Sequence, residues 1–406
     1  MPVPAAVGYA AIGIIAGLVA LIHQGPSSFV PGVCERLEPY LLSEVVGQEL
    51  AVSQLSDAIC DHVSNDNPHK PLVVSVHGPP GVGKSMSHLL AARALYNQDP
   101  SQQTQCPGQD CPGYKVLYGM DYISSEKEQQ LALLRASLLE HCSQYPEALI
   151  VVEEYDKLDC STRGFLRQLF ENARAANVTL DRSVIILESN SGYLQLHELL
   201  QAAGHRGKVR AEDAQRVLKD LVFDLWRSDN CEERSDTLKM LALVDFFLPF
   251  LPLERPHIER LFGMKLVERR KGLVDAKQAA NLTWDDDVVH FLTDRVDFEG
   301  PYPIEGAKEV STLMTRYISR ALRAWSAQQA ARKQVALPGA DREKKHGALT
   351  SRVMSTLKKM KGKRSQPAPK EDDLLPIAHL AVGKDALGNP QVVAQTQQQL
   401  EQCVGK

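Results

Sequence analysis

Apolar residues gather in short runs along the first half of the chain, separated by polar and glycine-rich stretches. The run over 71–77 carries Val or Leu at successive positions, which is typical of a strand buried on both faces. Similar runs predict three more strands, over 114–118, 148–152 and 184–187. Because helical spacing separates these runs, we expect an α/β domain with a parallel sheet and helices on both faces.

The pattern changes near Pro249, beyond which only helical spacing is found. Three helices are predicted, over 256–270, 284–296 and 306–325, and Thr283 is the expected N-cap of the second helix. We therefore expect a large domain over 41–248 and a small C-terminal helical lid domain over 249–328.

Residues 329–406 are poor in aromatic residues and rich in Lys, Gln, Ala and Pro, with a basic run between Lys358 and Arg364. This composition predicts a disordered, solvated tail. The alternative is a basic segment that binds an acidic partner or lipid head groups.

The N-terminus carries no charged residue from Val3 to Ile22, a stretch long enough to cross a bilayer. It lacks the basic flank and the cleavage pattern of an ordinary signal peptide. Its glycines suit a buried soluble helix badly. We expect a signal anchor or signal peptide over 1–24 and a linker over 25–40, which is rich in Pro, Gly and Ser up to Gly32 and looks helical beyond it.

An N-terminal segment of this kind would send the rest of the chain into the lumen of the endoplasmic reticulum. Two glycosylation triplets agree with that location, at Asn177 and Asn281. The eight cysteines do not form a dense disulfide scaffold, and Cys106 and Cys111 lack a second pair that would complete a zinc site. We expect isolated thiols with one surface disulfide.

The formal net charge of -4 over 406 residues is close to neutral. It gives no reason to expect nucleic acid as a partner. Binding to a membrane is instead expected through the N-terminal segment.

The strongest chemical signal is the segment Gly78-Pro79-Pro80-Gly81-Val82-Gly83-Lys84-Ser85, which lies between the first predicted strand and a predicted helix. Glycines let successive backbone N–H groups converge on phosphate oxygens, and the start of the helix adds partial positive charge. Lys84 is expected to bridge the β- and γ-phosphates of a bound ATP, and Ser85 to place its hydroxyl on Mg²⁺.

Polar residues follow two of the other predicted strands. Glu153 and Glu154 end the strand over 148–152, and such a pair can hold a metal ion through water and polarise an attacking water. Asn190 follows the strand over 184–187, where an amide could orient that water. Lys308, near the start of the last predicted helix, could reach the phosphates from the lid, although alone it would read as a surface lysine.

Together these residues resemble AAA+ ATPases of the Clp branch, and most closely the torsins, from about Leu41 to about Ala321. The resemblance rests on Val46-Gly47-Gln48, Lys70-Pro71-Leu72, Glu153-Glu154-Tyr155-Asp156-Lys157, Ser189-Asn190, Gly207-Lys208-Val209-Arg210 and Gly306-Ala307-Lys308. Its most distinctive part is the run from Val244 to Glu254, Val-Asp-Phe-Phe-Leu-Pro-Phe-Leu-Pro-Leu-Glu.

Torsins are luminal ATPases of the endoplasmic reticulum and nuclear envelope. The resemblance implies that Val46 and Gly47, with Gln48, line the adenine pocket. It also implies that Glu154 is the catalytic base, Asn190 the sensor-1 residue and Lys308 the sensor-2 residue. The implied cofactors are ATP and Mg²⁺, with Ser85 and Glu153 serving the metal.

The sequence departs from the torsin pattern at several positions. Ser85 replaces the usual Asn, which favours hydrolysis, and Glu153 replaces the usual Asp, which is expected to slow turnover without abolishing it. Ala307 stands where torsins have Cys, so thiol control of nucleotide binding is not expected. Leu243 stands where Clp unfoldases carry an arginine finger, a group that contributes a factor of about 10³–10⁵ in rate where it exists.

Torsins share this gap and borrow an arginine from a membrane-anchored activator, so we expect such a partner here, together with a homo- or hetero-oligomer. Arg234 and Arg255 are the in-chain alternatives. Tyr118 and Gly119 are only a loose match to an aromatic pore loop, which makes polypeptide threading less favoured. Two alternatives stay open: a self-sufficient Clp-like unfoldase, and a scaffold that binds ATP without hydrolysing it.

Overall fold

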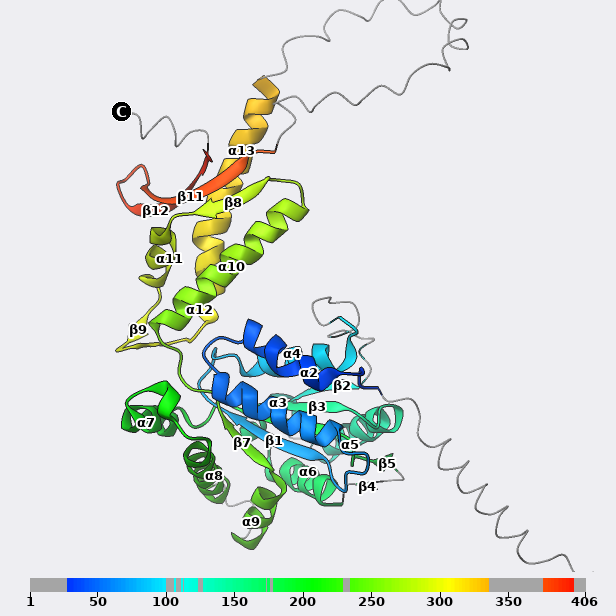
Figure 1. Cartoon of the computed structure of the whole chain (residues 1–406). Helices are drawn as coiled ribbons and strands as arrows, with labels where there is room; N and C mark the ends of the chain where they lie inside the picture. Colours follow the sequence, from blue (N-terminus) through cyan, green and yellow to red (C-terminus); the bar gives the residue numbers. More distant parts are fainter. Residues whose placement is uncertain are drawn as a thin grey trace, which may run out of the picture. The chain divides into compact units, whose positions relative to one another are not determined.

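The computed structural model describes residues 28–99, 106, 111, 113–122, 127–172, 174–175, 178–228, 234–335 and 375–397. The chain divides into two compact units, the first ending at Leu253 and the second beginning at Glu254 (Figure 1). The expected anchor over 1–24 lies outside the described residues. Within the described ranges, no helix is both long enough and apolar enough to cross a membrane.

A five-stranded parallel sheet forms the centre of the first unit, in the order β2-β3-β6-β1-β7. Its strands are β1 Leu72–His77, β2 Tyr114–Tyr118, β3 Leu149–Glu153, β6 Val184–Ser189 and β7 Phe246–Pro249. Every residue of β1 and β6 is buried, as the unbroken apolar runs predict for strands covered on both faces. The four predicted strands are therefore confirmed, with ends that differ by at most two residues.

The fifth strand, β7, was not predicted. It lies at the edge of the sheet beside β1, where a proline such as Pro249 is tolerated because its missing N–H costs no ladder bond. Asp245 fixes the start of this pairing, since its carboxylate accepts a hydrogen bond of 3.0 Å from the N–H of Val73. The residues of the distinctive Phe-Phe-Leu-Pro run thus form an edge strand next to the phosphate-loop strand.

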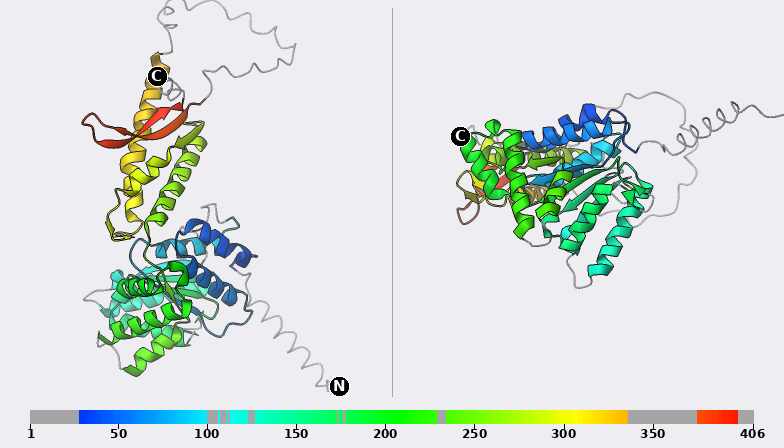
Figure 2. Two further views of the ribbon diagram at one scale, coloured as in Figure 1. Left: turned by 60° about the vertical axis from the view of Figure 1, so that its left-hand side comes forward. Right: turned by 90° about the horizontal axis from the view of Figure 1, so that it is seen from below.

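Helices cover both faces of the sheet, with the blue helices on one side and the teal and green ones on the other (Figure 2). The first group is α2 Val33–Glu44, α3 Glu49–Val63 and α4 Lys84–Tyr96. The second is α5 Lys127–Gln144, α6 Cys160–Asn172, α7 Tyr193–Ala203, α8 Ala211–Ser228 and α9 Arg234–Leu243. The hairpin of β4 Arg174–Ala175 and β5 Val178–Thr179 lies apart from the main sheet. The parallel α/β sheet with helices on both faces, as in AAA+ proteins, is confirmed.

Helix α8 shows how local pattern places these helices. Its buried residues are Ala214, Leu218, Val222 and Trp226, which recur every four positions and so form one apolar stripe. Helix α2 packs on α3 and α4, which makes residues 33–40 part of the first unit. The expectation that 25–40 is a linker is wrong for those residues, because Val33, Leu37 and Leu41 are buried on one helix face.

The second unit combines helices with sheet, so the expectation of a purely helical domain is wrong. Its helices are α10 Arg255–Asp275, α11 Asp286–Thr293, α12 Lys308–Leu313, a π-helical turn over Met314–Ser319, and α13 Arg320–Val335. A capping box between Glu254 and His257 starts α10. A short hairpin joins β9 Phe298–Glu299 to β10 Tyr302–Pro303.

Thr283 is not the N-cap of α11. It lies in strand β8 Asn281–Trp284, and Asp285 takes the N-cap position. Strand β8 exists because β11 Ile377–Lys384 pairs with it in parallel from almost a hundred residues away. A pairing partner so distant in sequence cannot be found from local periodicity.

The expected disordered tail over 329–406 contains ordered structure, and the expectation is wrong for those parts. Helix α13 continues to Val335, and β11 forms an antiparallel hairpin with β12 Pro390–Thr396 around a turn at Gly388. The hairpin packs against α13, where the indole N–H of the buried Trp325 donates to Thr396 Oγ1 at 3.3 Å. The strands were missed because the average composition of residues 329–406 does not show the short alternating strand pattern near the end of this segment.

Candidate phosphate-binding site

The loop between β1 and α4 requires glycine at three places. Gly78, Gly81 and Gly83 have φ angles of 153°, 74° and 105°, which other residues rarely adopt. A Cβ on Gly78 would also overlap the carbonyl oxygen of Phe250, just after β7. The loop therefore depends on glycine for its backbone conformation, and Phe250 packs directly against Gly78.

Lys84, the first residue of α4, is only 5% exposed and reaches back over this loop. Its Nζ donates to the carbonyl oxygens of Gly78 and Pro79 at 3.0 and 2.9 Å. It also donates to Asn190 Oδ1 at 2.9 Å. The structure thus brings together two predicted site residues that are more than a hundred positions apart in sequence.

Ser85 points toward an acidic side chain that the sequence reasoning had passed over. Its hydroxyl donates to both carboxylate oxygens of Glu188, at 2.9 and 3.1 Å. Glu188 is 7% exposed and lies directly across from Glu153, because β3 and β6 pair in that register. The available signal was a carboxylate at the end of an otherwise apolar strand, but only the register shows that it meets Ser85 and Glu153.

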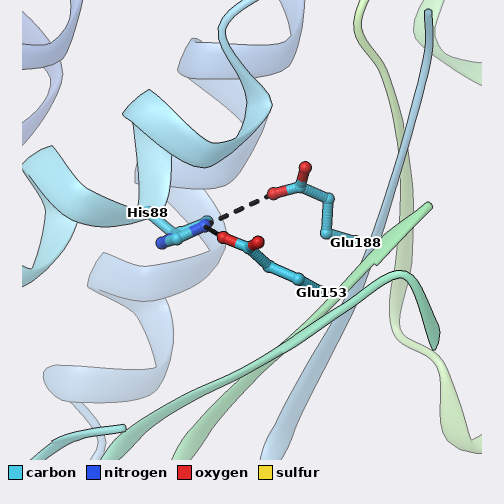
Figure 3. Close-up of side chains that lie close together, drawn as sticks. All are labelled: His88, Glu153 and Glu188. Carbon is cyan, nitrogen blue, oxygen red and sulfur yellow. Dashed lines mark hydrogen bonds and ion pairs between the residues drawn. The ribbon is translucent and has the colours of Figure 1, made fainter. Parts of the chain in front are cut away.

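His88, one turn further along α4, joins the same group (Figure 3). Its Nε2 lies 3.1 Å from Glu153 Oε1 and 3.3 Å from Glu188 Oε2. Its Nδ1 lies 2.9 Å from the hydroxyl of Tyr114 on β2. Burial by itself would lower the pKa of His88, but the hydrogen bonds with Glu153 and Glu188 outweigh it and the pKa is raised.

Glu154 has an unusual backbone conformation, with φ 54° and ψ 40° in the left-handed region. A non-glycine residue held there stores about 1–3 kcal/mol, and such residues cluster at functional sites. Gly119, at the end of β2, allows this, because a Cβ at that position would overlap the carbonyl oxygen of Glu154. The close contact with Glu154 also explains why position 119, in the loose match to an aromatic pore loop, is a glycine.

A buried histidine links the loop to the turns after β3 and β6. His77 Nε2 lies 2.7 Å from Ser75 Oγ and 3.3 Å from the hydroxyl of Tyr155, next to Glu154. Its Nδ1 lies 3.1 Å from Ser191 Oγ, next to Asn190. Burial, with a smaller contribution from the Lys84 cation, lowers the pKa of His77 to about 3, so the ring is neutral.

The segment Val46-Gly47-Gln48 contacts the loop from another side. The buried Gln48 side chain donates to the carbonyl oxygens of Val82 and Leu251 and accepts from the Leu251 N–H at 2.9 Å. Arg206 Nε donates to the carbonyl oxygen of Gly47 at 2.9 Å. Gln48 is thus a brace for the loop, and the adenine-pocket role of Val46 and Gly47 stays a prediction.

Two further predicted positions belong to the second unit. Lys308 is exposed at the start of α12, and its sensor-2 role stays a prediction. Arg255, one alternative arginine finger, donates to Asp294 at 2.8 Å and lies over the ring of Phe298. Leu243 is the last residue of α9, and the side chain of Arg234 lies outside the described residues.

Cys106 and Cys111 form a disulfide, and both residues are buried, whereas the one expected disulfide was a surface one. Cys160 is disulfide-bonded as well. Among the described residues, Cys34, Cys60 and Cys142 are free thiols.

The donors around the loop fit a nucleotide and its metal ion. The glycine-rich backbone has the positive φ angles of an anion-binding loop, Lys84 supplies a buried cation, and Ser85, Glu153 and Glu188 supply hard oxygen ligands. These features lie at the carboxyl end of a parallel sheet, where β1 lies between β6 and the edge strand β7. They define a P-loop protein of the AAA+ class.

Comparisons of the sequence with known proteins agree with the AAA+ class and point to torsins within it. The torsin family profile matches residues 25–105. A torsin-like protein of Drosophila melanogaster is 24% identical over 277 residues, which cover 64% of this chain and 74% of that protein. A torsin-like protein of Caenorhabditis elegans is 26% identical over 243 residues, 58% of this chain and 65% of that protein. These matches support assignment of the chain to the torsin family.

The chaperone protein ClpB of Chlamydia pneumoniae is 26% identical over 267 residues, which cover 64% of this chain but only 29% of ClpB. This match fits the Clp-like branch. The chain spans less than a third of that relative, so the activity of a whole ClpB does not transfer to it.

Proposed function

We propose that this protein binds ATP with Mg²⁺ at the loop 78–85 and hydrolyses it to remodel protein or membrane assemblies. The observation that carries the proposal is the meeting of Lys84 with Asn190 and of Ser85 with Glu188, which lies across from Glu153 near the ends of β6 and β3. Lys84 would hold the β- and γ-phosphates, and Ser85 and Glu153 would hold Mg²⁺, which neutralises phosphate charge when bound.

Glu154 would orient the attacking water and take its proton. Its backbone is fixed in the left-handed region by the close approach of Gly119, so its side chain starts from a defined direction. Asn190 would hold the water from the other side. Tyr155 and Ser191 follow these two residues, and both contact His77, so one buried ring ties the two water-orienting turns together.

We place the protein in the lumen of the endoplasmic reticulum or nuclear envelope, attached to the membrane by residues 1–24. The disulfides support this location, since disulfides persist in oxidising compartments and are rare in the cytosol. The triplet at Asn281 would be a glycosylation site there. A glycan-dependent gel shift of the wild type that is lost in Asn281→Gln would support this location. Absence of that shift in the wild type, together with a cytosolic fractionation pattern, would speak against it.

A membrane-anchored activator would complete the site with an arginine. The support is the uncharged Leu243 at the position of the Clp arginine finger, and the engagement of Arg255 by Asp294. The test is the ATPase rate of the full chain alone and with luminal domains of candidate activators. We expect stimulation that disappears when one activator arginine is changed, and full activity without any partner would refute the activator.

A self-sufficient Clp-like unfoldase is the second candidate, favoured by the matches to ClpB. It predicts high basal ATPase activity and unfolding of a tagged model substrate without an activator. Low basal activity with no unfolding would leave the activator-dependent remodeller as the better account.

A further inference from the structure

The group formed by His88, Glu153 and Glu188 goes beyond what Mg²⁺ requires. Mg²⁺ is bound in proteins by oxygen ligands and water, whereas imidazole nitrogen suits Mn²⁺, Co²⁺, Zn²⁺ and related ions. His88 is 3% exposed and its Nε2 faces both carboxylates (Figure 3).

The distances match those of ligands that share one ion. Ligand atoms about 2.1 Å from a metal ion lie about 3.0 Å apart at neighbouring octahedral positions and about 3.4 Å apart in a tetrahedron. The Nε2 of His88 is 3.1 and 3.3 Å from the two carboxylate oxygens. The three ligand atoms all lie within 4.8 Å of one another, so one ion can contact all three after small side-chain shifts.

The surroundings of His88 are those of a metal ligand held in place. Tyr114 OH contacts the other ring nitrogen at 2.9 Å, which fixes the ring plane, as outer-shell partners of metal-binding histidines do. Three elements of the fold converge here, since α4 carries His88, β3 carries Glu153 and β6 carries Glu188. Ser85, hydrogen-bonded to Glu188, offers a further oxygen at the position expected to serve the nucleotide's metal.

We propose that His88, Glu153 and Glu188 bind one divalent transition-metal ion of the Mn²⁺ class, already in the absence of nucleotide. Tyr114 is a positioning residue for this site. The ion is then resident on the protein beside the phosphate loop, where it shares Glu153 with the site proposed for the Mg²⁺ of the nucleotide. The role of Glu153 toward the nucleotide rests on the proposed function, but binding of the resident ion does not.

The test is a Mn²⁺ titration of the purified full chain, stripped of metal and free of nucleotide, with unbound Mn²⁺ measured by electron paramagnetic resonance. We expect one equivalent bound at least about tenfold more tightly than Mg²⁺ in competition. His88→Gln and Glu188→Gln should each weaken binding by at least about tenfold, and Tyr114→Phe by about tenfold. His69→Gln, which changes an exposed histidine of the same unit, is the matched control and should bind Mn²⁺ as the wild type does.

A second measurement needs no variant and so does not depend on how the variants fold. The pulsed spectrum of the stoichiometric Mn²⁺ complex of the wild-type chain should show coupling to a directly bound imidazole ¹⁴N. Absence of that coupling, equal affinity for Mg²⁺, or unchanged Mn²⁺ binding in a folded His88→Gln protein would each overturn the proposal.

Lys84→Ala separates this inference from the proposed function, because Lys84 holds the phosphate loop and is not among the three ligands. It should abolish ATP binding while Mn²⁺ binding persists. If the wild type binds Mn²⁺ through His88 but hydrolyses no ATP, the proposed function fails alone. If ATP is hydrolysed but Mn²⁺ binding ignores His88, the metal site fails alone.

Discussion

The buried ring of His77 makes the stability of the first unit dependent on pH. The His77 side chain is completely buried, and its burial together with the Lys84 cation lowers its pKa to about 3. In the unfolded chain the pKa of a histidine is about 6.5. As the pH falls from about 6.5 to about 3, the histidine therefore takes up a proton in the unfolded state but stays neutral in the folded state.

The sign follows from this difference in bound protons. The stabilisation from the neutral buried ring is complete above the unfolded pKa of about 6.5 and is lost as the pH falls toward the folded pKa. From pH 7.5 to pH 5 the loss is about 2 kcal/mol. The pKa of the unfolded chain sets this figure, because at pH 5 the folded ring stays almost entirely neutral.

The perturbation is His77→Gln, which keeps a hydrogen-bonding side chain but cannot titrate in this range. The protein is equilibrated in urea at pH 7.5 or at pH 5 to measure its free energy of unfolding. The unfolded fraction is then read from a pulse of hydrogen exchange, given at one fixed labelling pH and followed on peptides from β1 and β6. The variant should be less stable than the wild type at pH 7.5. Its loss of stability between the two pH values should be about 2 kcal/mol smaller than that of the wild type.

The comparison isolates His77 because other buried groups remain in both proteins. His62 and His141 also have pKa values lowered by burial, and they contribute the same pH dependence to the wild type and the variant. Equal pH dependence in the two proteins would refute the assignment of a neutral, buried ring to His77.

Three more predictions follow from single contacts. Gly78→Ala should abolish binding of fluorescent ATP in a folded protein, because its Cβ overlaps the Phe250 carbonyl, and near-normal affinity would contradict that contact. Glu154→Gly should be about 1 kcal/mol more stable than Glu154→Ala in urea unfolding, since glycine relieves the left-handed strain, and equal stability would show that there is no strain. Trp325→Ala should destabilise the second unit by about 3–5 kcal/mol and expose the β11–β12 hairpin to hydrogen exchange, whereas unchanged protection would mean that the hairpin does not depend on α13.

The parts of the fold that the sequence predicts are those specified by local pattern. The phosphate loop needs glycines at fixed spacing after a buried strand, and all of that information lies between residues 71 and 85. The four predicted strands are short, mostly apolar runs. Edge strand β7 is short and contains Pro249, and β11 needs β8 as a partner, so neither has a local signal strong enough to find it.

The site was predictable to the same extent. Lys84, Ser85, Glu154 and Asn190 are recognised from their places after strands and in the loop. His88 and Glu188 are not, because their meeting depends on the register of β3 with β6 and on which face of α4 points to the sheet. Such contacts are tertiary, and a one-residue shift in register would separate them.

The central claim is that ATP bound at the phosphate loop is hydrolysed with the help of Glu154. The most direct measurement is a single-turnover experiment, in which radiolabelled ATP is bound to an excess of the full chain and the bound nucleotide is identified over time. The wild type should convert bound ATP to ADP, at least with an activator present. Glu154→Gln should bind ATP equally well and retain it unhydrolysed. Equal conversion by both proteins, or no bound nucleotide in either, would contradict the account.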